Sequence, residues 1–113
     1  MRAIPKKLLI HTVRLQRTIS KDRWGEGKTS NEVELEKVRI EPSGRIVRDK
    51  NSAEVQLAAT LFYDCRNSMP KDFVFKEDDI ILFNEQKLRV QVIELLYDGN
   101  RLHHYELGLI KRA

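Results

Sequence analysis

The chain has few of the features that mark a secreted, metal-binding or membrane-spanning protein. Its 113 residues include one cysteine, Cys65, so it can form no internal disulfide and has no pair of thiols for a metal. After the basic N-terminus, the unbroken apolar run covers only residues 8–10, far short of a signal-peptide core or a membrane span. We therefore expect a protein of a reducing compartment that contacts no membrane.

The sequence also lacks catalytic motifs: it has no phosphate-binding glycine loop, nucleophile elbow or two-histidine metal helix. His103 and His104 are adjacent, and adjacent strand residues point to opposite faces, so we expect no shared metal ion. The acidic run 77–79 predicts a solvated turn, and Cys65 predicts a half-buried residue at a strand end. We therefore expect no enzymatic activity, no metal and no cofactor.

Composition favours one small, highly charged domain that covers residues 1–113. Hydrophobic residues make up 41% of the chain and charged residues 34%, which is too apolar for a disordered tail. There are 21 Lys and Arg residues against 17 Asp and Glu, and both signs are interspersed along the chain. This mild cationic bias permits contact with DNA phosphates but does not indicate a sequence-reading DNA binder.

Period-two alternation predicts strands throughout the chain. In residues 54–64 one face carries Val55, Leu57, Ala59, Leu61 and Tyr63. Residues 8–17 read as a second strand, and its expected core face carries Leu9, His11, Val13 and Leu15. The alternation changes phase within residues 33–40, which predicts a β-bulge near Glu36 and Lys37.

The C-terminal half predicts a β-meander with strands at 79–83, 87–95 and 102–110. Residues 84–86 and 98–100 form the expected turns, and Gly99 supplies the positive φ that a tight hairpin needs. Residues 19–31 and 42–53 are predicted as long loops, with one or two helical turns near 68–72. The predicted fold is all-β: a small closed or partly open antiparallel β-barrel with long loops.

Both predicted loops contain candidate contact residues. Trp24, with Arg23 and Gly25, either covers an open end of the barrel or forms a partner interface, because Trp is a common hot-spot residue. The segment 42–53 is either a solvated hairpin or a projecting arm that approaches DNA or a neighbouring subunit. Its candidate residues are Ser43, Gly44, Arg45, Ile46, Val47, Arg48, Asp49 and Lys50.

Five segments in this order resemble the minor capsid proteins of tailed phages and prophages of Gram-positive bacteria, a group similar to head-closure, or stopper, proteins of the phage neck. They are Ile4-Pro5-Lys6 with Leu9-Ile10-His11, Asp22-Arg23-Trp24-Gly25, Val38-Arg39-Ile40-Glu41-Pro42, Leu61-Phe62-Tyr63-Asp64-Cys65, and Leu96-Tyr97-Asp98-Gly99 through His104-Tyr105-Glu106. The resemblance implies a ring in the virion neck, assembled in the bacterial host cytoplasm.

In that family a long loop between early barrel strands reaches into the channel, and residues 42–53 hold this position here. The implied partners are the head-completion adaptor, tail proteins, further copies of the chain, and packaged double-stranded DNA held without sequence preference. The ring would retain DNA and provide the tail attachment site. Two alternatives stay open: a tail-side connector, and a single-stranded nucleic-acid-binding module of the OB type, which would need stacking aromatics on one strand face.

Overall fold

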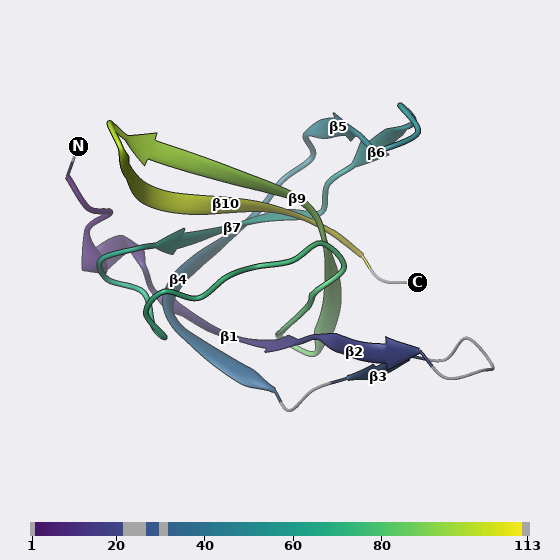
Figure 1. Ribbon diagram of the computed structural model, residues 1–113, viewed down its shortest axis with the longest axis horizontal. Helices are drawn as coiled ribbons and strands as arrows, with labels where there is room; N and C mark the ends of the chain where they lie inside the picture. Colours follow the sequence, from purple (N-terminus) through teal and green to yellow (C-terminus); the bar gives the residue numbers. More distant parts are fainter. Residues whose placement is uncertain (1, 22–26, 30–31, 112–113) are drawn as a thin grey trace.

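A closed barrel of six antiparallel strands forms the body of the protein. The computed structural model describes residues 2–21, 27–29 and 32–111. Around the barrel the strand order is β1-β4-β7-β10-β9-β8, and β8 pairs with β1 to close it (Figure 1). The barrel strands are β1 (His11–Gln16), β4 (Val33–Pro42), β7 (Ala59–Asp64), β8 (Ile80–Phe83), β9 (Gln86–Asp98) and β10 (Arg101–Lys111). The predicted all-β barrel is confirmed, and it is closed.

The remaining elements are two hairpins and one short helical turn. A 3-10 turn, η1 (Lys6–Leu8), precedes β1. One hairpin pairs β2 (Thr18–Lys21) with β3 (Gly27–Thr29), and the other pairs β5 (Ile46–Arg48) with β6 (Glu54–Gln56). β2, β3 and β5 occur in or beside the segments predicted as loops, because runs of three or four residues are too short to show alternation, whereas β6 is the first part of the strand predicted over residues 54–64.

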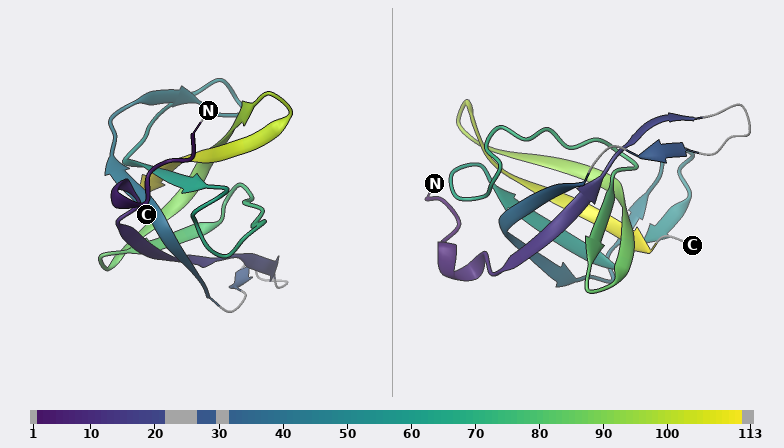
Figure 2. Two further views of the ribbon diagram at one scale, coloured as in Figure 1. Left: turned by 90° about the vertical axis from the view of Figure 1, so that its left-hand side faces the viewer. Right: turned by 90° about the horizontal axis from the view of Figure 1, so that it is seen from below.

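The two hairpins extend from the same end of the barrel. In Figures 1 and 2 they lie on the side where β10 ends, whereas the N-terminal segment and the tip of the β9–β10 hairpin lie at the opposite end. β9 and β10 are the longest strands and run along most of the barrel's length. The barrel therefore has one end with projecting hairpins and one end with the anchored N-terminus.

The inward faces of the strands fill the barrel with aliphatic and aromatic side chains. The shared face predicted for residues 54–64 points into the core at four of its five positions, since Leu57, Ala59, Leu61 and Tyr63 are all at most 7% exposed, whereas Val55 is half-buried. This segment is two strands instead of one, because the backbone changes partners in its middle. Leu57 N–H donates to Arg45 O, and Ala58 N–H donates to Leu109 O. The core face predicted for residues 8–17 is confirmed at Leu9, which precedes β1, and at Val13 and Leu15, whereas His11 is half-buried.

The predicted bulge in β4 is confirmed at Glu36 and Lys37. His11 pairs with Val38 while Val13 pairs with Leu35, so β4 has one extra residue at this point. Lys37 has a φ of 54°, and Leu35 and Val38 on its two sides are both fully buried. The bulge therefore keeps the apolar side chains of both halves of β4 inside the barrel.

Two predicted turns are confirmed and one predicted helix is wrong. Asn84 and Glu85 both have positive φ between β8 and β9, and Gly99 has a φ of 63° between β9 and β10. Residues 68–72 form no helical turn. Met69 instead donates its N–H to Glu36 O on β4 and accepts the N–H of Glu36. Its backbone groups are therefore not available for helical hydrogen bonds.

Candidate functional site

The β5–β6 hairpin contains most of the predicted arm. Three residue pairs join its strands, and its turn is organised by Asp49, whose Oδ1 accepts the N–H groups of Asn51 at 2.8 Å and Ala53 at 2.9 Å. Pro42, predicted as the start of the loop, is the last residue of β4. The segment 42–53 is thus a strand end followed by the first strand and turn of a hairpin.

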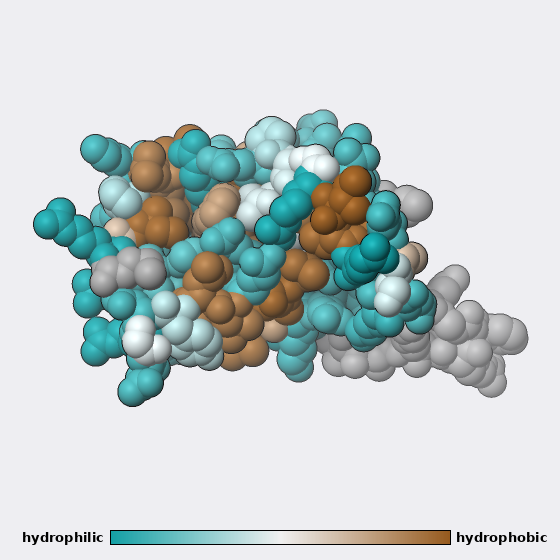
Figure 3. Space-filling view, turned by 90° about the horizontal axis from the view of Figure 1, so that it is seen from above, coloured by the Kyte–Doolittle hydropathy of each residue, from teal (hydrophilic) through white to brown (hydrophobic). Residues whose placement is uncertain are grey.

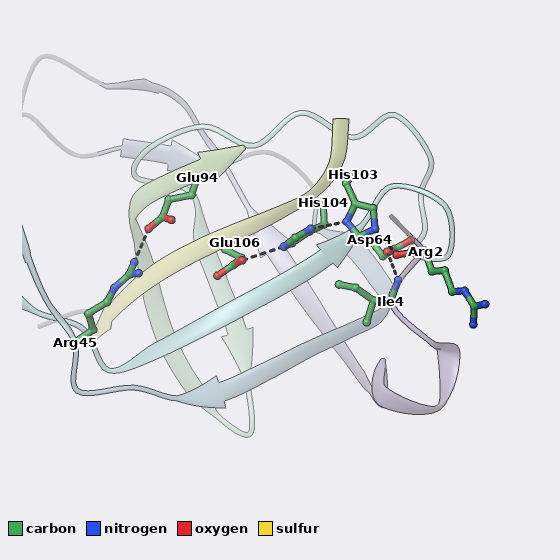
Figure 4. A network of polar contacts seen from close by, with 8 residues as sticks. All are labelled: Arg2, Ile4, Arg45, Asp64, Glu94, His103, His104 and Glu106. Carbon is green, nitrogen blue, oxygen red and sulfur yellow. Dashed lines mark hydrogen bonds and ion pairs between the residues drawn. The ribbon is translucent and has the colours of Figure 1, made fainter. Parts of the chain in front are cut away.

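Each of the three predicted cations of this segment lies near a carboxylate of the same chain. Arg45 Nη2 lies 2.5 Å from Glu94 Oε1 on β9 (Figure 4). Arg48 Nη2 lies 3.9 Å from Glu54 Oε1 on β6, and Lys50 Nζ lies 3.2 Å from Glu77 Oε2. The first pair reaches β9 and the third reaches the segment before β8, but all three are exposed, so each stabilises the hairpin by only about 0–1 kcal/mol.

The apolar residues of the hairpin differ in exposure. Ile46 is 59% exposed, whereas Val47 is half-buried opposite Val55. Val55 also lines a groove between the hairpin and β9, whose other walls include Arg89 and Ile110. Seen from above, the apolar patches of the surface are separated by polar side chains (Figure 3). Ile46 is therefore the apolar side chain of the hairpin best placed for a contact with another molecule.

The second predicted interface, Arg23, Trp24 and Gly25, lies outside the described residues. The strands on either side of it are described, and Thr18 pairs with Thr29 and Lys21 with Gly27. The segment therefore connects the two strands of a projecting hairpin. Whether Trp24 covers the barrel or contacts a partner stays a prediction.

A second polar cluster, which the sequence did not indicate, holds the N-terminal segment at the opposite end of the barrel (Figure 4). Asp64, at the end of β7, accepts the N–H of Ile4 at Oδ2 over 2.7 Å. Asn67 Nδ2 donates to Ile4 O over 2.8 Å, and His103 Nε2 lies 2.5 Å from Arg2 O. Three barrel side chains thus bind the main chain of residues 2–4.

His103 and His104 lie side by side, so the expectation that they point to opposite faces is wrong. Their Nδ1 atoms are 2.7 Å apart, because the pairing of β10 with β9 shifts by one residue between Leu102 and His104. His104 Nε2 also lies 2.9 Å from Glu106 Oε2. Within the described part of the chain, no three His, Cys, Asp or Glu side chains are grouped to hold a metal ion.

The histidine pair lies between a backbone carbonyl and a carboxylate. At one end His103 Nε2 lies beside the carbonyl oxygen of Arg2, and at the other His104 Nε2 lies beside the carboxylate of Glu106. The two rings thus link the N-terminal segment to Glu106 through a continuous row of polar contacts.

The acidic run 77–79 is not a solvated turn throughout. Asp79 is 1% exposed and accepts hydrogen bonds from Arg17 Nε and Nη2, both at 2.9 Å, and from Lys76 N–H at 2.8 Å. The carboxylate raises the pKa of Arg17, mainly through this hydrogen bond. Arg17 also lies 5.5 Å over the ring of Phe73. Burial of Asp79 is possible because all of these partners are donors.

Cys65 is half-buried at the end of β7, as predicted. Burial raises the pKa of its thiol, and the neighbouring carboxylate of Asp64 raises it further. The thiol is therefore less ionised than a free cysteine, which is the opposite of an activated nucleophile.

The aromatic side chains pack mainly against one another inside the barrel. Tyr63 meets Phe75 and Tyr105 edge to face, with ring centroids 5.3 and 5.8 Å apart, and Phe73 meets Phe75 at 5.0 Å. This cluster is internal, whereas base stacking needs exposed rings on a strand face. The arrangement disfavours the single-stranded nucleic-acid module.

Comparison with known families decides what kind of protein this is. The family model described as "Minor capsid protein" matches residues 5–109. The chain belongs to the minor capsid protein family of phages. This minor capsid protein is therefore a virion-associated structural component, and its family suggests no enzymatic role. Searches among curated proteins and among solved structures found no match. No helix in the described part of the minor capsid protein is long and apolar enough to span a membrane.

Proposed function

We propose that this minor capsid protein is a head-closure protein of the phage neck. It forms a ring below the head-completion adaptor and above the tail, retains the packaged double-stranded DNA and provides the tail attachment site. Family membership supports a structural role in the virion. The observation that carries the neck assignment is a closed barrel from one end of which two hairpins project, as a channel-lining arm requires.

The β5–β6 hairpin is the proposed channel and subunit-contact element, with residues 43–50 as its functional part. Its cations are paired with exposed carboxylates, so DNA phosphates can compete for them at little cost. A ring of identical subunits multiplies such weak contacts. The balanced charge also favours release, because DNA does not adhere strongly to a surface in which each cation has a carboxylate beside it.

Subunit contact in the channel is assigned to the exposed Ile46 and the free strand edges of the hairpin. Within the described residues, β5 and β6 pair only with each other, so each keeps one unpaired edge. A neighbouring hairpin can pair with such an edge, as strand-adding complexes do. Arg23, Trp24 and Gly25 are the proposed contact with a partner protein of the virion.

The first test is to delete the coding region in its prophage, induce, and image the particles by electron microscopy. The proposal expects separate tails beside heads that have lost their DNA. Normal tailed virions would overturn it. Particles with filled, closed heads and no tails would move the protein to the tail side of the connector.

Variants of the hairpin separate its two roles. Deletion of residues 43–51 should make purified filled heads leak DNA. The triple variant Arg45→Ser, Arg48→Ser and Lys50→Ser removes the DNA-facing charge, while Ile46→Asp removes the exposed apolar contact and leaves the cations. Leakage from the Ile46→Asp particles alone would assign closure to subunit pairing, and leakage from the triple variant alone would assign it to phosphate contact.

A further inference from the structure

The N-terminal segment is held almost entirely through its backbone. Asp64, Asn67 and His103, which we call the backbone clasp, bind the N–H and carbonyl of Ile4 and the carbonyl of Arg2. None of these contacts uses a side chain of residues 2–4. The clasp therefore recognises an extended main chain and not a particular sequence.

The clasp is built without help from the segment that it holds. Asp64 is fully buried, and its Oδ1 accepts the N–H groups of Arg66 at 2.8 Å and Asn67 at 3.0 Å. Its own N–H donates to Ser68 Oγ at 2.9 Å. These bonds fix the free oxygen of the carboxylate, Oδ2, whether or not Ile4 is present. A site fixed in this way loses little conformational freedom when a chain binds.

The third member of the clasp is fixed by the barrel wall. His103 contacts His104 on β10, which contacts Glu106 on the same strand (Figure 4). The side chain of His104 is only 12% exposed, so it has little freedom to move away. Two sides of the site, the turn that follows β7 and the strand β10, are therefore in place before any main chain is bound.

The bound segment itself buries little surface. Residues 5–8 are exposed, Ala3 and Ile4 are half-buried, and Leu9 is the first buried side chain, at 4% exposed. Among the described residues, the backbone of the segment is also reached by Arg39, whose Nη1 donates to Leu8 O at 3.1 Å. Separation of residues 2–8 from the barrel thus breaks a few hydrogen bonds and leaves the core intact.

We propose that the backbone clasp is a binding site for extended polypeptide main chain, and that it accepts the N-terminal segment of a second copy of this protein. Every bond to residues 2–4 can be made equally by the same residues of a neighbour, because the contacted atoms belong to the backbone. Exchange of identical elements between copies is a low-cost route to association. The inference does not depend on the neck position, since the exchange takes place between any two copies.

The test is chemical cross-linking between full-length chains of two different masses, both with Cys65→Ser. The donor chain has Ala3→Cys and the acceptor chain has Arg101→Cys, because Ala3 and Arg101 line the same pocket beside His103. A short bismaleimide is added to the mixture, and mixed dimers are separated by denaturing gel. One chain with both substitutions should close internally, which shows that the linker spans the site.

The matched controls separate exchange from random collision. A donor with Lys87→Cys, exposed on β9, reports collision alone. An acceptor that also has Asn67→Asp replaces the clasp donor with a carboxylate of the same size, and circular dichroism checks that it is folded. Exchange predicts several-fold more mixed dimer from the Ala3→Cys donor than from the Lys87→Cys donor, and a fall to the Lys87 level with Asn67→Asp.

Equal yields from the two donors, with internal closure of the doubly substituted chain, would overturn the proposal and leave the segment bound only within its own chain. An Ala3→Cys excess that Asn67→Asp does not reduce would also overturn it, because the contact would then bypass the clasp. Both readouts use isolated protein, so failure here leaves the head-closure proposal standing.

Discussion

The buried pair between Arg17 and Asp79 allows a sharp test of how this barrel is held together. Asp79→Asn keeps the size of the side chain but removes its charge. All three partners of the carboxylate are N–H donors: Arg17 Nε and Nη2, and the backbone of Lys76. An amide has one acceptor oxygen, so its NH2 group must face a donor, and Arg17 loses its counter-charge.

The structure sets the size of the expected effect. Breaking a buried ion pair by removing one partner costs about 3–5 kcal/mol. Because the side chain of Arg17 is 28% exposed and can regain some hydration, we expect the lower end, about 3 kcal/mol. At roughly 4 °C per kcal/mol for a domain of this size, the melting temperature should fall by about 12 °C.

The neighbouring residue supplies a matched control. Asp78 is paired with Arg89 at 2.8 Å, but its side chain is 69% exposed, so Asp78→Asn should cost less than about 1 kcal/mol. Urea and thermal unfolding of the two variants beside the unsubstituted protein measure the difference. Similar shifts for both substitutions would refute the argument that burial makes the Asp79 pair important.

Four further predictions concern single residues. Lys37 has a φ of 54° in the β4 bulge, so Lys37→Gly should raise the free energy of unfolding by about 1 kcal/mol in urea titrations, and a loss would contradict this assignment of strain. Gly99 has a φ of 63° with open space around it, so Gly99→Ala should cost about 1 kcal/mol through the backbone alone; no change in the urea midpoint would contradict it. Because burial raises the pKa of Cys65, its reaction with a maleimide should be slower than that of a free thiol at the same pH. The thiol of the unfolded chain also ionises at a lower pH than the thiol of the folded protein. Its contribution to the free energy of unfolding is therefore complete below the ordinary pKa of cysteine and is lost as the pH rises through the raised pKa of the folded state. In urea titrations at several pH values, Cys65→Ser should flatten this decline.

The barrel could be predicted because its signals are local. Alternation in residues 8–17 and 54–64 follows from which side chains face the core, and the phase change in residues 33–40 located the bulge. The turn between β9 and β10 could be located because it contains Gly99, which adopts a positive φ. In each case the information lies within a few neighbouring residues, so no knowledge of the three-dimensional partner was required.

The rest depended on partners that are distant in the sequence. Arg17 and Asp79 are separated by 62 positions, and Ile4 and Asp64 by 60, so no motif links them. The histidine pair was mispredicted because its geometry comes from a shift in the pairing of β10 with β9, which the residues of β10 alone do not encode. The hairpin cations were identified, but not the carboxylates of Glu94 and Glu77 that face two of them.

The closed barrel has a mechanical consequence for the hairpin that it supports. β4 and β7, the strands on either side of β5–β6, each have a neighbour on both sides: β1 and β7 for one, β4 and β10 for the other. An open sheet can yield to tension by peeling its outermost strand, one hydrogen bond at a time. Here a force on the hairpin acts on the backbone hydrogen bonds on both sides of β4 and β7 together, so many of these bonds must break at the same time. The hairpin can therefore bear a load while the strands of the barrel stay paired.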